Sequence, residues 1–123
     1  MIGGSAPLEV RVAALVFALG GLLFAGGSFA WGTQIGDTSV AIVPAVDAVV
    51  GLLLGGLLAV GARAARMPAF VWAALITILQ IVLALGVAPV WLRILCGLLA
   101  AAHVYAFVLL NTAPAGRYLG GAR

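Results

Sequence analysis

The chain has 123 residues, of which 66% are hydrophobic and only 7% are charged, and its formal net charge is +3. A soluble domain carries about a quarter charged residues, and a disordered chain is poor in apolar residues, so the composition excludes both classes. The basic residues are scattered rather than clustered, and we therefore expect no nucleic-acid partner. The sequence predicts an all-α integral membrane protein in contact with the lipid bilayer.

Four apolar runs are each long enough to cross a bilayer, which takes about 20 residues. The segments between them are short and contain glycine, proline, aspartate and arginine, the residues that end helices and form turns. Residues 1–123 are therefore expected to form one membrane domain, a four-helix bundle with short loops. We predict transmembrane helices over about 12–32, 41–62, 68–86 and 91–111.

The first apolar run contains Ser28-Phe29-Ala30, which resembles a signal-peptide cleavage site. The run is longer than the apolar core of a signal peptide, and no excess of basic residues precedes it. We therefore expect this first helix to be retained as a membrane span.

The arginines predict the orientation, because cytoplasmic loops carry an excess of positive charge. With the N-terminus inside, five of the six arginines lie on the cytoplasmic side and only Arg93 lies outside. Both termini are therefore expected in the cytoplasm, with Trp31 and Trp91 at the outer membrane interface and Trp72 near the inner one. The bias toward arginine, alanine and glycine without lysine favours a bacterial plasma membrane. The five inner arginines are Arg11, Arg63, Arg66, Arg117 and Arg123.

Asp47 is the one acidic residue within the predicted spans. If its helix begins near residue 41, the carboxylate lies about 9 Å inward along the helix axis and could bind a proton or a cation. Alternatively, Pro44 opens the helix and Asp47 lies in its first turn. There the helix dipole and interfacial water would stabilise the negative charge.

We single out three further polar side chains within the predicted spans: Thr77, Gln80 and His103. Thr77 and Gln80 are three residues apart, so they share a helix face and can hydrogen-bond to a neighbouring helix. His103 could relay protons, contact a cofactor, or hydrogen-bond across helices to Gln80 or Thr77. Because it is the single histidine, we predict no cofactor held by this chain alone, and haem or quinone contact through His103 would need a partner. No spacing of cysteine and histidine indicates a metal site, and Cys96 is expected to be a packing residue.

Small residues recur every four positions at Gly51, Gly55 and Ala59. Such a ridge lets two helix backbones approach closely. The partner helix could belong to this chain, to a second copy, or to another membrane subunit.

The sequence contains no set of residues typical of an enzyme, such as a serine–histidine–aspartate group, a paired carboxylate or a phosphate-binding loop. Its size and plan resemble those of the small multidrug resistance transporters, which carry a glutamate within their first helix. Here no acid lies between Val12 and Trp31, and Glu9 precedes that run, so we assign no family.

Two functions fit these observations. The first is a non-catalytic accessory or structural subunit that packs against a larger respiratory or transport assembly, as minimal loops and small-residue ridges indicate. The alternative is a small homo-oligomeric transporter or channel, coupled to protons or cations through Asp47, Gln80 and His103.

Overall fold

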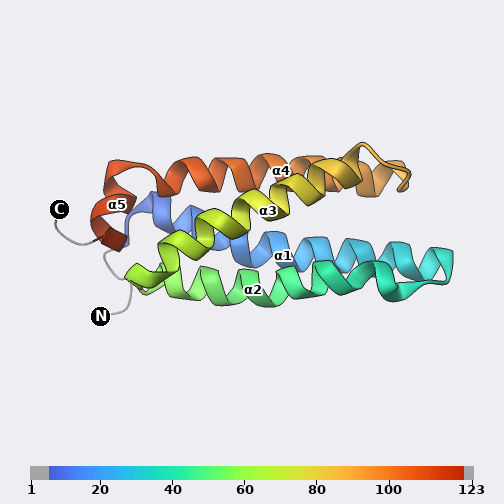
Figure 1. The fold of residues 1–123 in the computed structure, drawn as a ribbon, viewed down its shortest axis with the longest axis horizontal. Helices are drawn as coiled ribbons and strands as arrows, with labels where there is room; N and C mark the ends of the chain where they lie inside the picture. Colours follow the sequence, from blue (N-terminus) through green and yellow to red (C-terminus); the bar gives the residue numbers. More distant parts are fainter. Residues whose placement is uncertain (1–5, 121–123) are drawn as a thin grey trace.

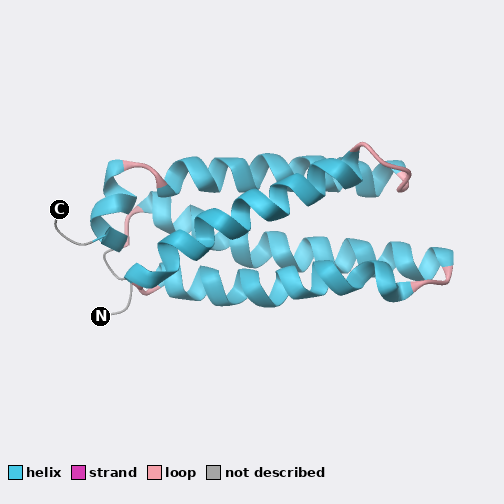
Figure 2. Cartoon of the chain, viewed as in Figure 1, coloured by secondary structure: helices cyan, strands magenta, loops and turns pink. Residues whose placement is uncertain are grey.

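Four long helices joined by short loops form the protein in the computed structural model, which describes residues 6–120 (Figure 2). All four are long and apolar enough to cross a membrane, so the chain is a multi-pass membrane protein whose apolar helices contact lipid. The long helices are α1 (Leu8–Ile35), α2 (Ile42–Ala59), α3 (Arg66–Ala84) and α4 (Val90–Leu110). The 3-10 helices η1 (Thr38–Ala41) and η2 (Arg63–Ala65) precede α2 and α3, and α5 (Ala113–Gly120) follows α4.

The predicted four-helix bundle is confirmed, but the sequence did not indicate α5. The last predicted helix ends near residue 111, and no helix is predicted after it. In the structure α4 ends at Leu110, and a further short helix follows in which Pro114 is the second residue. Proline is tolerated there because the first residues of a helix have no intrahelical acceptor for their N–H groups.

The helices do not pack on one another equally. The contact between α1 and α2 is the most extensive, α3 packs mainly on α4, and α2 touches α3 only slightly. Figure 1 shows the cause, since α3 crosses the bundle obliquely from the end of α2 toward the start of α4. The seam between α2 and α3 is therefore the weakest packed side of the bundle.

The small-residue ridge of α2 is buried against α1 of the same chain. A Cβ added at Gly51 would collide with the carbonyl oxygen of Phe17, and one at Gly55 would lie 2.7 Å from the carbonyl oxygen of Ala14. The close approach is mutual, because a Cβ at Gly21 of α1 would lie 2.8 Å from the carbonyl oxygen of Asp47. The two backbones are therefore in contact without side chains between them, as small residues permit.

Two arginines cap the antiparallel pair α3 and α4. Arg66 at the start of α3 donates from Nη2 to the carbonyl oxygen of Leu110 at the end of α4, at 3.1 Å, and its guanidinium lies over the ring of Phe70. At the other end, Arg93 in the first turn of α4 donates from Nε to the carbonyl oxygen of Ala84 at the end of α3, at 2.9 Å. Each arginine thus meets the negative end of the neighbouring helix dipole.

The loop between α1 and α2 turns at Gly36, whose φ of +73° lies in the left-handed region. Asp37 then caps η1 by accepting hydrogen bonds from the hydroxyl and the backbone N–H of Ser39. The hydrogen bond from the Ser39 hydroxyl, and to a lesser extent that from its backbone N–H, holds the pKa of Asp37 below its ordinary value.

Both ends of the described chain lie at one end of the bundle, next to α5 (Figure 1). That end also carries Arg11, Arg63 and Arg66. That it faces the cytoplasm stays a prediction from the distribution of arginines.

Candidate functional site

Asp47 lies inside the bundle. It is the sixth residue of α2, the first turn of that helix contains no acid, and only 1% of the residue is exposed. The alternative that placed it in the first turn beside interfacial water is therefore wrong. The 3-10 helix η1 extends the helical segment before α2, so Asp47 lies deeper than Pro44 alone would suggest. Its Oδ1 accepts a hydrogen bond, whereas its Oδ2 has no partner.

The hydrogen bond to Asp47 comes from Trp72 of α3, whose indole Nε1 lies 2.7 Å from Oδ1. The sequence predicts Trp72 only as a residue near the inner membrane interface and gives no signal for this contact. Trp72 is only partly exposed and also lines a groove of about 420 Å³ between α2 and α3, next to Val50 and Leu54. One side chain therefore joins the intramembrane carboxylate to the loosely packed seam of the bundle.

His103 is the second ionisable residue in the core, and none of it is exposed. Its Nδ1 lies 2.8 Å from the carbonyl oxygen of Leu99, one turn earlier in α4, and its Nε2 has no partner. The ring of Phe17 meets the imidazole edge-on, with centroids 5.8 Å apart. The expected cross-helix hydrogen bond to Gln80 or Thr77 is therefore wrong. A haem or quinone held by a partner would not reach the ring without a rearrangement of the helices around it.

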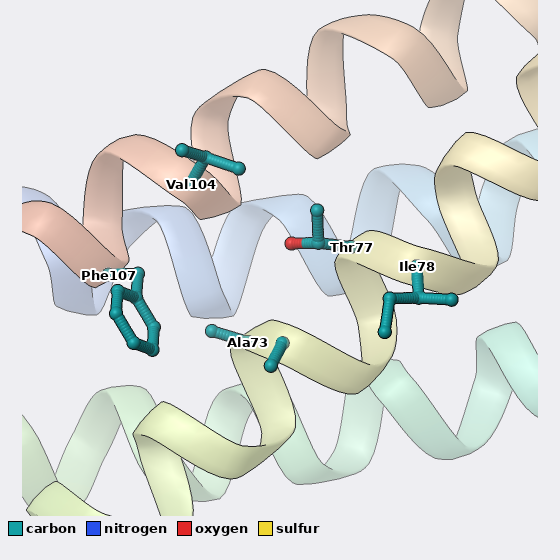
Figure 3. Close-up of a pocket in the computed structure, with 6 residues that line it drawn as sticks. Ala73, Thr77, Ile78, Val104 and Phe107 are labelled. Carbon is teal, nitrogen blue, oxygen red and sulfur yellow. The ribbon is translucent and has the colours of Figure 1, made fainter.

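Thr77 and Gln80 both lie on the buried face of α3. Thr77 faces the groove of about 270 Å³ between α3 and α4, together with Ala73, Val104 and Phe107 (Figure 3). Gln80 has no exposed surface, and neither its oxygen nor its nitrogen has a hydrogen-bond partner. The structure thus places both inside the protein but joins neither to Asp47 nor to His103 by a hydrogen bond.

Asp47 and His103 meet the same turn of α1. A Cβ at Gly20 would lie 3.1 Å from Cε1 of His103, and the backbone of Asp47 lies against Gly21. Apolar clusters lie on both sides of this level, one around Phe17 and the other around Phe24. The polar pair therefore occupies a narrow layer between two apolar halves of the core.

This arrangement can bind protons or small polar ligands, since it offers a carboxylate oxygen and an imidazole nitrogen without protein partners. Among residues 6–120, no three histidine, cysteine, aspartate or glutamate side chains are grouped as metal ligands would be. Comparison of the chain with protein-family models, with curated proteins and with solved structures finds no match.

Proposed function

We propose that this chain is a small proton transporter or channel of a bacterial plasma membrane, in which Asp47 binds and releases the proton. One observation carries the proposal: a carboxyl group that is 1% exposed within a membrane span keeps one oxygen without a partner. A buried carboxylate is costly in a bilayer and marks a functional site by default. A carboxyl group that served only to hold helices together would have both oxygens bonded.

His103 and Gln80 extend the polar path beyond Asp47. Both are fully buried; Nε2 of His103 is free to take up a proton, and the amide of Gln80 is free to hydrogen-bond to water. We assign them to the proposed path because their buried polar atoms have no hydrogen-bond partner that would account for a purely structural role.

The test is proton flux into liposomes that contain the purified protein, driven by an imposed membrane potential and read by an internal pH-sensitive dye. We expect the wild type to exceed empty liposomes and Asp47→Asn to lose the flux by at least about tenfold, because an amide cannot take up a proton here. The amide oxygen of asparagine can still accept the hydrogen bond from Trp72, so the fold should persist.

Asp37→Asn is the matched control, since Asp37 is an exposed acid in the loop after α1. It should leave the flux unchanged. A wild type no better than empty liposomes, or an Asp47→Asn variant with full flux, would overturn the proposed function.

The accessory subunit is the second candidate, and the groove between α3 and α4 favours it. Its lining is apolar and includes the small side chains of Ala73 and Thr77, which a helix of another subunit could approach closely (Figure 3). Ala74 is exposed at the rim of this groove. The glycine ridge of α2 no longer supports such a role, because it packs inside the chain.

Gentle extraction followed by a native gel and mass spectrometry tests the subunit role. The protein should migrate with larger membrane subunits at a fixed stoichiometry, and Ala74→Leu, which fills the groove, should release it. Leu75→Ala, a change at an exposed residue of α3 that does not line the groove, is the control and should keep the complex intact. A protein that always migrates alone would rule out the subunit role.

A further inference from the structure

The buried polar atoms of the site require partners that the chain does not supply. Oδ2 of Asp47 and Nε2 of His103 have no hydrogen-bond partner, and the two residues are at most 1% exposed. Buried polar groups in native proteins are nearly always hydrogen-bonded, and bilayer hydrocarbon offers none. A molecule other than the chain is therefore expected at this level of the core.

The hydrogen bonds already present determine what that molecule must offer. A carbonyl oxygen only accepts, so the bond to Leu99 places the hydrogen of neutral His103 on Nδ1 and leaves Nε2 as a bare acceptor. Oδ1 of Asp47 accepts from Trp72, and Oδ2 of the ionised carboxylate is a second bare acceptor. Two acceptors without donors need a ligand that donates in two directions, and water does so.

The packing sets both residues at one level of α1. The imidazole of His103 lies against Gly20, and the backbone carbonyl of Asp47 lies against the next residue, Gly21. The edge of Phe17 closes one side of the imidazole with an apolar ring. Ordered waters in proteins occupy such polar spots within apolar surroundings and make about three hydrogen bonds each.

We propose that ordered water is bound within the bundle at the level of Gly20 and Gly21, donating hydrogen bonds to Oδ2 of Asp47 and to Nε2 of His103. When Asp47 is protonated, the water accepts the Oδ2–H proton and passes one of its own to Nε2, so that His103 becomes the imidazolium and Asp47 the carboxylate. Charge and atoms are conserved in this transfer. The relay role rests on the proposed function, whereas the presence of the water does not.

The experiment uses full-length protein in lipid nanodiscs, labelled with ¹⁵N on its single histidine and its single cysteine. Magnetisation transfer from water protons should reach the imidazole of His103. It should not reach the backbone amide of Cys96, which lies in the apolar cluster around Phe24. The neutral histidine should show the form that is protonated at Nδ1 and bare at Nε2.

Asp47→Leu should abolish the transfer from water to the imidazole, because it removes one of the two acceptors, whereas Asp37→Leu in the exposed loop should leave it unchanged. Two wild-type results would each overturn the proposal without any variant: no transfer to His103, or a hydrogen on Nε2. A histidine signal that shifts on titration with Na⁺ would show a bound cation in place of water and would also overturn it. Water without liposome flux would refute only the proposed function, and flux without bound water would refute only this inference.

Discussion

Gly51→Ala is expected to lower the free energy of unfolding by about 1–3 kcal/mol, the usual cost of overfilling a packed core. The added Cβ would collide with the carbonyl oxygen of Phe17, which belongs to a helix backbone and cannot rotate away as a side chain could. Relief therefore requires α1 and α2 to separate along their whole contact, which is the most extensive in the bundle. Reversible unfolding in mixed micelles, followed by circular dichroism, measures the effect.

Gly56→Ala is the matched control on the same helix. Gly56 is exposed and a Cβ there meets nothing within 4 Å, so alanine should be neutral or stabilise the helix by about 0.5–1 kcal/mol. Equal stabilities for the two variants would contradict the view that backbone contact between α1 and α2 holds the fold. A separation of α1 from α2 caused by Gly51→Ala would also disturb the positions of Asp47 and His103, because both residues pack against neighbouring glycines of α1.

The four-helix architecture could be predicted from the sequence because each membrane span is encoded by one continuous stretch of residues. Each run of about 20 apolar residues predicts one helix, and arginine or proline at its ends predicts the turns. The observed helices follow these runs closely, whereas α5 escaped prediction because a short helix after Leu110 needs neither a long apolar run nor a strong cap. Its position depends on tertiary contacts such as the hydrogen bond from Tyr118 to the carbonyl oxygen of Ala59.

The contacts of the candidate site could not be read in the same way. Asp47 and His103 were singled out as rare polar residues in apolar runs, but their partners depend on how the helices cross. Asp47 lies twelve residues before the end of α2 and Trp72 six residues after the start of α3, so counting along straight helices puts them about 9 Å apart in depth. Only the oblique course of α3 and the length of the indole side chain bring them together (Figure 1).

Trp72→Phe is expected to lower the free energy of unfolding by about 1–3 kcal/mol, because it leaves Oδ1 of a buried carboxyl group without its hydrogen-bond donor. The phenyl ring keeps most of the apolar contact along the groove with Val50 and Leu54, so the loss reports mainly on the hydrogen bond to Asp47. Unfolding followed by circular dichroism avoids a signal that depends on the substituted tryptophan. Trp91→Phe, at the start of α4 where the residue is 41% exposed, is the control and should change stability little.

A double-mutant cycle isolates the contact between Trp72 and Asp47. In an Asp47→Ala background there is no carboxyl group that could lose its hydrogen bond. Trp72→Phe should therefore lower the free energy of unfolding markedly less than in the wild type, with a coupling energy of about 0.5–3 kcal/mol. Equal costs in both backgrounds would contradict a stabilising bond. Under the proposed function, the bond also links the proton-binding carboxyl group to the seam between α2 and α3, because these helices otherwise touch only slightly and Trp72 lines the groove between them. Protonation of Asp47 removes the negative charge that strengthens this bond, so proton binding at the carboxyl group would loosen the seam where the bundle is packed most weakly.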